Sequence, residues 1–127
     1  MIKVAAGIIF NDGKFLVARR SAHKSMGGKW EFPGGKIEQN ETPEETLIRE
    51  FKEEFNITIT IDHFFLDTTH DYGDFTINLV SFKGRFIEGT IKLVDHDSYL
   101  WIEVDNLNDF DWAEADIPII QKLQSNE

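Results

Sequence analysis

Residues 34–57, GGKIEQNETPEETLIREFKEEFNI, decide the fold of this chain, because they join two glycines, a helix start and a crowd of acids. Thr42-Pro43 followed by two glutamates is typical of a helix N-terminus, with an N-cap residue, a proline in the first position and acids in the first turn. The sequence therefore predicts a helix from Pro43 to about Phe55. Four apolar residues recur at helical spacing and are expected to pack inward: Leu47, Ile48, Phe51 and Phe55.

Glu50, Glu53 and Glu54 lie three and four residues apart on this helix, so their carboxylates share one face. A solvated acidic face is one interpretation, since glutamate is a good helix former on protein surfaces. The other is a metal site, because Arg49 is the main base near the three acids and oxygen ligands on a rigid element suit Mg²⁺ or Mn²⁺. The two glycines upstream form a turn that would let the backbone approach a ligand closely.

The same stretch resembles the Nudix box, G-x5-E-x7-R-E-U-x-E-E-x-G-U, in which U is a bulky apolar residue. The residues that match, each at the required offset, are Gly35, Glu41, Arg49, Glu50, Phe51, Glu53, Glu54 and Ile57. The one departure is Asn56, where the pattern has glycine. Asparagine is the next-best residue for a left-handed helix stop, so we expect a small stability cost and no loss of function.

Four other stretches resemble the MutT branch of this family, and most closely its CTP pyrophosphohydrolase and 8-oxo-dGTP diphosphatase types: VAAGIIF, FLVARR, KWEFPGGKIE and ADIPIIQKL. The resemblance covers nearly the whole chain. It implies a Nudix fold, an α/β/α sandwich with a mixed central β-sheet, as a single domain over residues 1–127. It also implies metal-dependent hydrolysis of a nucleoside triphosphate to the monophosphate and pyrophosphate.

The roles of the box residues follow from the resemblance. Glu50, Glu53 and Glu54 would hold the divalent metals, with the carbonyl of Gly34 as a further ligand, while Arg49 would orient the carboxylates. Glu41 would pair with Arg49, and Gly35 would support the box. The resemblance implies a general base either within the box or on a loop before a late strand, six residues before a tryptophan, which here is Asp95; the alternative is that Asp95 and Asp97 are ordinary acidic loop residues.

Substrate contacts are assigned more loosely. Arg20 and Lys36 are candidates for phosphate oxygens, with surface solvation as the alternative for both. Glu31 would contact the metal or the ribose, or else make a structural hydrogen bond at the end of a strand. A base pocket needs an apolar or aromatic wall and a polar group aimed at the base edge; the candidates are Phe32, Tyr72, Asp74, Phe75 and Asp116.

Asp116 aligns with a base-reading asparagine of the MutT pattern. A carboxylate there can accept a hydrogen bond from an exocyclic amino group such as cytosine N4, and a protonated one could accommodate an oxidised purine. The alternative is that Asp116 caps the last helix.

The rest of the chain reads as mixed α and β structure. Residues 3–10 and 14–20 flank Asn11-Asp12-Gly13, which indicates a β-hairpin, and residues 21–30 indicate a loop. Strands are expected over four segments, residues 57–70, 74–86, 90–94 and 98–104, with a turn at 71–74. The closing stretch, residues 112–124, predicts a helix that begins near Asp116 or Ile117.

Composition limits the partners of the protein. A chain of 127 residues with 41% apolar residues, eleven phenylalanines and three tryptophans favours a folded globule. The net charge of −10 makes duplex nucleic acid and anionic membranes poor partners, whereas a small nucleotide can bind an acidic site that metal ions screen. No long apolar run or signal-peptide pattern is present, so we expect a cytoplasmic monomer or homodimer.

Two rival functions remain open. One is a Nudix hydrolase acting on another nucleoside diphosphate-linked substrate, such as ADP-ribose or a dinucleoside polyphosphate. The other is a nucleotide-binding Nudix module without catalysis, against which the intact set of three glutamates argues.

Overall fold

The computed structural model describes residues 1–24 and 27–125 and is built around one mixed sheet. Strands β1 (Ile2–Asn11) and β2 (Lys14–Arg20) form the predicted hairpin. Asp12 and Gly13 both have positive φ, 54° and 79°, which is the backbone that a two-residue type I′ turn requires. Residues 25 and 26 of the predicted loop lie outside the described residues.

The other strands of the sheet are β3 (Trp30–Glu31), β4 (Gly34–Lys36), β5 (Ile57–Asp71), β6 (Thr76–Gly89) and β7 (His96–Ile102). The main path runs β3-β2-β1-β6-β5, with β4 paired to β1 and β7 paired to β2. β1 and β6 are parallel, from Ile2 opposite Ile77 to Phe10 opposite Arg85, and every other strand pair is antiparallel. The predicted mixed sheet is therefore confirmed.

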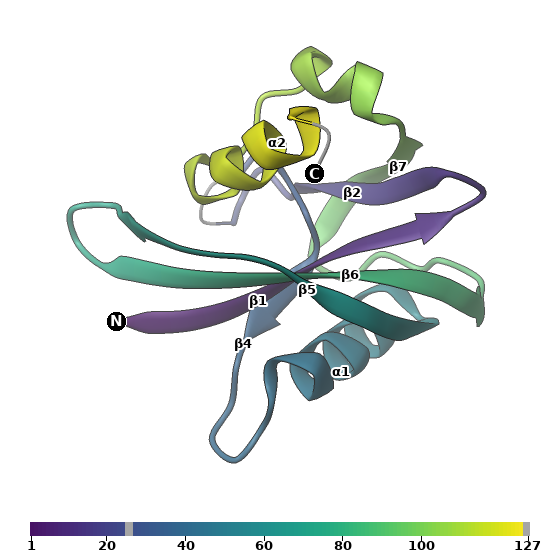
Figure 1. Cartoon of the computed structure of the whole chain (residues 1–127), viewed down its shortest axis with the longest axis horizontal. Coiled ribbons are helices and arrows are strands. Elements are labelled where there is room, and N and C mark those ends of the chain that lie inside the picture. The colour runs from purple at the N-terminus through teal and green to yellow at the C-terminus, as the bar shows by residue number, and fades with distance from the viewer. Residues whose placement is uncertain (25–26, 126–127) are drawn as a thin grey trace.

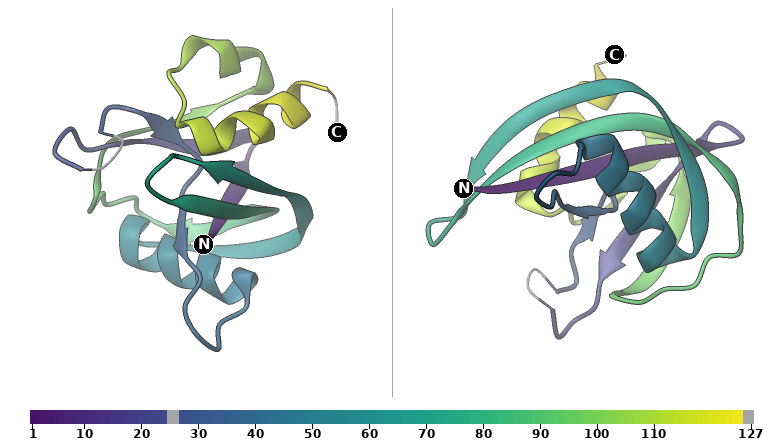
Figure 2. Two further views of the ribbon diagram at one scale, coloured as in Figure 1. Left: turned by 90° about the vertical axis from the view of Figure 1, so that its left-hand side faces the viewer. Right: turned by 90° about the horizontal axis from the view of Figure 1, so that it is seen from below.

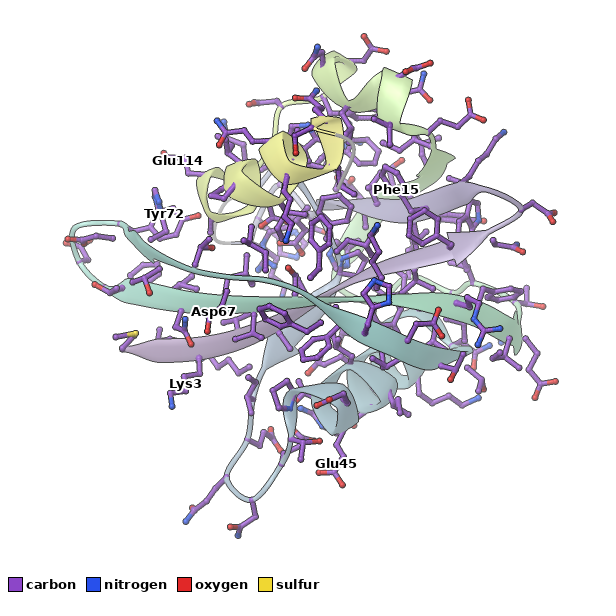
Figure 3. All side chains as sticks on the ribbon, in the orientation of Figure 1. Lys3, Phe15, Glu45, Asp67, Tyr72 and Glu114 are labelled. Carbon is purple, nitrogen blue, oxygen red and sulfur yellow. The ribbon has the colours of Figure 1, made fainter. Side chains whose placement is uncertain are left out.

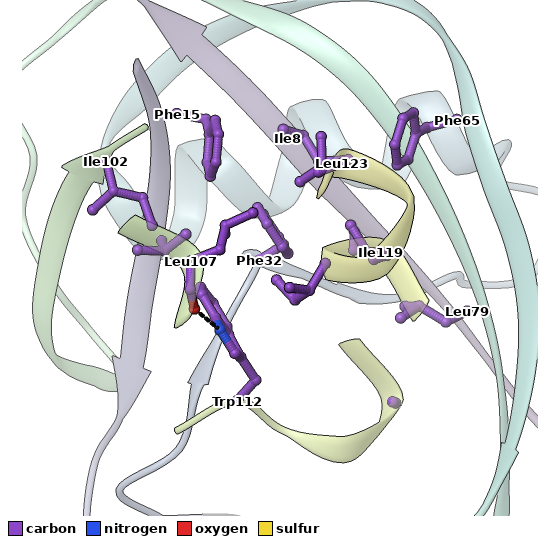
Figure 4. Packing of buried hydrophobic residues seen from close by; sticks show 14 residues of the cluster. Ile8, Phe15, Phe32, Phe65, Leu79, Ile102, Leu107, Trp112, Ile119 and Leu123 are labelled. Atoms are coloured by element: carbon purple, nitrogen blue, oxygen red, sulfur yellow. Dashed lines mark hydrogen bonds between the residues drawn. The ribbon is translucent and has the colours of Figure 1, made fainter. Parts of the chain in front are cut away.

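The two helices cover opposite faces of this sheet, as Figure 1 shows with α2 above it and α1 below. α1 (Pro43–Phe55) packs on one face over a core that includes Leu16, Leu47 and Phe51. Viewed from below, it lies across the strands (Figure 2, right). α2 (Ile117–Gln124) covers the second core, in which Phe32 stacks on Trp112 at 5.5 Å and the indole of Trp112 donates to Leu107 (Figure 4). The predicted α/β/α sandwich is confirmed.

Local interactions fix both ends of α1. The hydroxyl of Thr42 accepts the N–H of Glu45 at 3.1 Å, and the Glu45 carboxylate accepts the N–H of Thr42 at 2.9 Å, which forms a capping box. The helix ends at Asn56 with φ 61°, as predicted, and the Asn56 side chain donates to the carbonyl of Thr90. The expected inward packing of Ile48 is wrong, because this side chain is 47% exposed.

Three segments differ from the predictions. Residues 90–94 form no strand: Ile91 and Leu93 pack against the α1-side core, and the N–H of Lys92 donates to the carbonyl of Phe55. The alternating apolar residues of this segment therefore pack against the core although the segment pairs with no strand. Two 3₁₀ helices, η1 (Val104–Asp109) and η2 (Glu114–Asp116), were not predicted.

β1 and β2 separate soon after their turn, and this opening positions the site. They pair directly only at Phe10–Phe15 and Asn11–Lys14. Residues 30–36 enter between them, so that β3 pairs with β2 and β4 pairs with β1. The N–H of Gly7 donates to the carbonyl of Pro33 at 2.9 Å, which holds the inserted segment in place.

Candidate active site

Gly34 and Gly35 lie in strand β4, so their interpretation as a turn is corrected. A methyl group on Gly34 would overlap the carbonyl oxygen of Ala5, and one on Gly35 would overlap the carboxylate of Glu50. The first glycine therefore lets β4 pair closely with β1. The second makes room for a carboxylate of the helix, which links the strand to the acidic face of α1.

Arg49 joins the acids of the box. Its Nε donates to Glu41 at 2.7 Å, and its Nη1 donates to Glu50 at 2.9 Å and to Glu53 at 3.2 Å. The hydrogen bonds from Arg49, with a further one from Thr46, lower the pKa of Glu41 to about 2. The same contact with Glu41 raises the pKa of Arg49. The expected Arg49–Glu41 pair is present, and it holds a charged guanidinium beside two of the three acids.

Glu54 contacts Asp95, which comes from the distant segment before β7. Burial, and next the charge of Asp95, raise the pKa of Glu54. A hydrogen bond from Lys24, whose ammonium lies 3.2 Å from the Asp95 carboxylate, lowers the pKa of Asp95. The fold thus places the predicted Asp95 against the box, as a carboxylate beside Glu54. Asp97 instead points to the exposed side, where it accepts a hydrogen bond from Arg19 at 2.7 Å.

The carboxylates of the box are suitable ligands for a divalent cation, although their side chains are not arranged as a complete metal site. Within residues 1–24 and 27–125, no three carboxylate or histidine side chains lie close enough together to hold a metal ion as they stand. Glu53 is 59% exposed and turned to Arg49. Burial is the main cause that raises the pKa of Glu50, and Oε1 of Glu54 is buried without a hydrogen-bond partner in the described part of the chain. A hard cation would relieve both conditions.

A pocket of about 450 Å³ opens beside this acidic face. Seven of the predicted substrate residues line it, together with the two glycines of β4: Arg20, Glu31, Phe32, Lys36, Tyr72, Phe75 and Asp116. The structure does not place Asp74 with them; it is exposed in the turn between β5 and β6. The apolar wall comes from Phe75 and from alternate residues of two paired strands, Val4, Ala6, Ile77 and Leu79.

Asp116 is the buried polar group of the pocket, with 6% of its surface exposed. Its Oδ2 accepts the backbone N–H of Phe32 at 2.7 Å, and its side chain makes no capping bond with α2. Asp116 therefore occupies the predicted N-cap position of α2, but its side chain does not form the expected cap. Burial, and next the nearby charge of Glu31, raise the pKa of Asp116 well above its usual range. The pocket thus presents a carboxyl group that can be neutral and can then donate as well as accept.

Tyr72 connects the β5–β6 turn to the segment that carries Asp116. Its ring stacks on Phe75 at 5.3 Å, and its hydroxyl accepts the N–H of Ala115 at 3.0 Å. Tyr72 and Glu114 lie at the same edge of the molecule in Figure 3. The aromatic wall and the buried carboxyl group are therefore held in a fixed relation.

Comparison with known proteins identifies the family. The family model for the NUDIX domain matches residues 5–122 of this chain. The chain belongs to the NUDIX domain family. The CTP pyrophosphohydrolase of Escherichia coli (strain K12) is 33% identical over 125 residues, which cover 98% of this chain and 93% of that protein. The 8-oxo-dGTP diphosphatase of the same strain is 35% identical over 124 residues, covering 97% and 96%.

Solved structures agree with this assignment. The crystal structure of the MutT protein from Methanosarcina mazei Go1 matches with a TM-score of 0.86 at 25% identity, covering 99% of this chain and 95% of that one. The predicted membership of the MutT-like branch is confirmed, and the chain is a Nudix hydrolase. Over the residues that the structure describes, no helix has the length and apolar character that a membrane crossing needs.

One residue of this Nudix site was not predicted from the sequence. His96 is buried, and its Nε2 lies 2.8 Å from Oε2 of Glu31, which also accepts Nη1 of Arg20 at 3.3 Å. The available signal was its position next to Asp95, as a histidine between two aspartates. That signal was weak, because the contact depends on how β7 pairs with β2.

Proposed function

We propose that this Nudix hydrolase cleaves a nucleoside triphosphate to the monophosphate and pyrophosphate with Mg²⁺ or Mn²⁺. One observation carries the proposal: a single pocket runs from the buried Asp116 to Arg20, Lys36 and the two glycines beside Glu50. A nucleoside triphosphate has the matching order of groups, with a base for the end at Asp116 and phosphates for the basic and metal-binding end. In the reaction one water molecule is consumed and one P–O–P bond is broken.

The box carboxylates supply the charge for this chemistry. We infer that Glu50 and Glu54 hold the cation, with the carbonyl of Gly34, and that Glu53 joins them by turning from Arg49. When bound, the metal neutralises phosphate charge and acidifies a water molecule. Arg49 orients Glu50 and Glu53 through its hydrogen bonds. Asp95, whose pKa is lowered by Lys24, is ionised near neutral pH and is assigned as the group that accepts the proton of the attacking water.

Asp116 is assigned to the base. With Oδ2 bound to the N–H of Phe32, its other oxygen is left to contact the Watson–Crick edge of a base stacked between the apolar walls. An ionised Asp116 would accept from the amino group of cytosine, and a neutral one would donate to a carbonyl of 8-oxoguanine. The two relatives described above are named for these two classes of nucleotide. We propose that the substrate belongs to one of them.

A panel of substrates tests the reaction and the base together. Normal, 5-methylated and 8-oxidised triphosphates would be incubated with Mg²⁺ or Mn²⁺, and released pyrophosphate compared with released phosphate. Pyrophosphate from a cytidine or an 8-oxoguanine nucleotide is the expected result. Binding without release would favour the non-catalytic module, and activity on ADP-ribose or dinucleoside polyphosphates alone would favour the other hydrolase class.

Two variants assign the roles of residues. Glu53→Gln should lower kcat by at least ~100-fold, given the charge stabilisation that a metal contributes. Glu44→Gln, which changes an exposed glutamate of the same helix, should leave turnover unchanged. Asp116→Ala should lower kcat/KM for the preferred base class more than for the other. Equal losses for both classes would remove Asp116 from base selection.

Four features stay predictions: a cytoplasmic location, a monomer or homodimer, a single domain over residues 1–127, and the absence of nucleic-acid partners.

A further inference from the structure

His96 is a buried polar residue that the proposed reaction does not use. Its side chain is 5% exposed, and its ring packs 5.1 Å from that of Phe55, the last residue of α1. Nε2 lies 2.8 Å from Oε2 of Glu31, while Nδ1 is buried without a hydrogen-bond partner among the described residues. Burying an imidazole with one unsatisfied nitrogen costs stability. The contact between Nε2 and Glu31 is therefore the polar interaction that compensates for the burial of His96.

A β-bulge brings His96 to this position. β2 and β7 pair regularly from Phe15 opposite Ile102 to Arg19 opposite Ser98, and then the register shifts so that Arg20 lies opposite His96. A regular ladder would have placed Asp97, and not His96, opposite Arg20. With the bulge, Asp97 accepts a hydrogen bond from Arg19 on the exposed side, and His96 turns inward. Bulges beside active sites commonly redirect a side chain in this way.

Glu31 stands between His96 and the pocket. Its Oε2 lies 2.8 Å from Nε2 of His96 and accepts a hydrogen bond from Nη1 of Arg20 at 3.3 Å. Glu31 and Arg20 both line the pocket, whereas His96 does not and so lies behind them. The oxygen that Arg20 contacts is thus already engaged by the shorter bond. Without His96, Glu31 could turn and form a short bidentate pair with Arg20, as carboxylates and guanidinium groups prefer.

We propose that His96 is a positioning residue for triphosphate binding: it fixes Glu31 so that Arg20 is not drawn into a bidentate pair with it and can also contact phosphate oxygens at the edge of the pocket. The inference rests on the proposed function, because it assigns Arg20 to the triphosphate. It predicts an effect on binding, since His96 itself lies behind the pocket-lining residues. Loss of His96 should strengthen the Arg20–Glu31 pair and weaken the competing phosphate contact.

The test compares His96→Leu, which removes the donor and keeps an apolar side chain, with His96→Gln, whose amide N–H can replace Nε2. KM and kcat are measured with the best nucleotide of the panel. Binding of inorganic tripolyphosphate with Mg²⁺ is measured by calorimetry. His96→Leu should raise KM and the tripolyphosphate Kd by about tenfold, the effect of one charge-assisted hydrogen bond, with kcat changed much less. His96→Gln should stay close to the unmodified protein in all three.

A double-mutant cycle separates this role from simple packing. In a Glu31→Ala background, His96→Leu should change the tripolyphosphate Kd no further, because the residue through which His96 acts is absent. A tenfold loss that persists in that background would overturn the proposal, as would unchanged KM and Kd in the single variant. Should His96→Leu fail to fold, His96→Phe, which can pack on Phe55, carries the same comparison.

The two proposals fail separately. If the unmodified protein releases pyrophosphate from no nucleotide, the proposed function fails, and the tripolyphosphate cycle still decides the role of His96. If the protein is active and the cycle shows no coupling between His96 and Glu31, only the role of His96 is refuted.

Discussion

Alanine at Gly34 and alanine at Gly35 should have opposite consequences, although the two residues are neighbours in β4. Neither glycine has positive φ, so the backbone itself accepts alanine at both. At Gly34 the added methyl group overlaps the carbonyl oxygen of Ala5, a backbone atom of the paired strand. At Gly35 it overlaps the carboxylate of Glu50, the far end of a flexible side chain. Gly34→Ala should therefore damage the fold, and Gly35→Ala should damage the site.

The magnitude for Gly34→Ala follows from the contacts around β4. Three residue pairs join β4 to β1, and the bonds Gly7–Pro33 and Ile37–Lys3, both 2.9 Å, hold its two ends. Overpacking costs about 1–3 kcal/mol, and each backbone hydrogen bond that is lost adds about 1 kcal/mol. With one or two bonds lost, the free energy of unfolding falls by about 2–5 kcal/mol. For a chain of this length that lowers Tm by roughly 10 °C.

Gly35→Ala should cost about 1 kcal/mol, the price of moving the Glu50 side chain off its preferred rotamer. Its Tm should then fall by only about 3 °C. Turnover should fall by at least about tenfold, because the displaced carboxylate no longer meets the metal in the productive geometry.

The assay is thermal unfolding by circular dichroism, together with pyrophosphate release at saturating Mg²⁺ and nucleotide. Each variant is the control for the other, since both add one methyl group to the same strand. A Gly34→Ala protein with unchanged Tm would refute the packing argument. A Gly35→Ala protein with unchanged kcat would show that the position of Glu50 does not limit the reaction.

Two pH-dependent effects follow from the box acids. The pKa of Glu41 is about 2 in the fold against an ordinary value of 4.5, so its stabilising effect is complete above 4.5 and is lost as pH falls toward 2. The Tm difference between the unmodified protein and Glu41→Gln should be largest at neutral pH and should shrink across that window; a constant difference would contradict the Arg49–Glu41 assignment. The pKa of Glu54 is raised, so its ionised form destabilises the metal-free fold as pH rises. Glu54→Gln should raise Tm at pH 7 without metal and lose that gain in acid, while turnover falls; a lower Tm at pH 7 would count against the burial argument.

The parts of the site that the sequence predicted are those that lie close together along the chain. Glu41 and Arg49 are only eight residues apart: Glu41 precedes the N-cap Thr42, and its carboxylate lies along the first turns of α1, where it accepts from Thr46 and Arg49. Asn56 ended α1 in a left-handed conformation for an equally local reason. Asp95 was placed by its offset from Trp101 within one segment, and the fold brings it to Glu54.

The contacts that the sequence did not predict depend on strand register. Glu31 and His96 are 65 residues apart, and they meet because one bulge shifts the pairing of β2 and β7. A shift of one residue reverses which side chains face the site, and nothing in the composition of residues 95–98 specifies it. The wall of Ile77 and Leu79 reads as ordinary core in the sequence, since lining a pocket and filling a core need the same alternation.

The absence of a side-chain cap at Asp116, the N-cap residue of α2, has a more specific cause. An aspartate just before a helix usually accepts the free N–H groups of the first turn. Here another free N–H competes: Phe32 lies between β3 and β4, where the inserted segment passes from one strand partner to the other. Its N–H donates to Asp116 at 2.7 Å inside the core, and a buried donor without a partner would cost more than an exposed helix end.

The separation of β1 from β2 explains why the box identifies the reaction but not the base. Residues 30–36, which fill that opening, contribute to both ends of the pocket: Phe32 fixes Asp116 at the base end, and Gly35 admits Glu50 at the metal end. Glu31 lies in the same segment and joins Arg20 to His96. A substitution there can therefore change base selection and phosphate binding together. The box helix α1 approaches the pocket at its metal end, where Glu50 meets Gly35. The box residues can therefore carry the chemistry of the reaction, while their identities do not indicate which base the pocket binds.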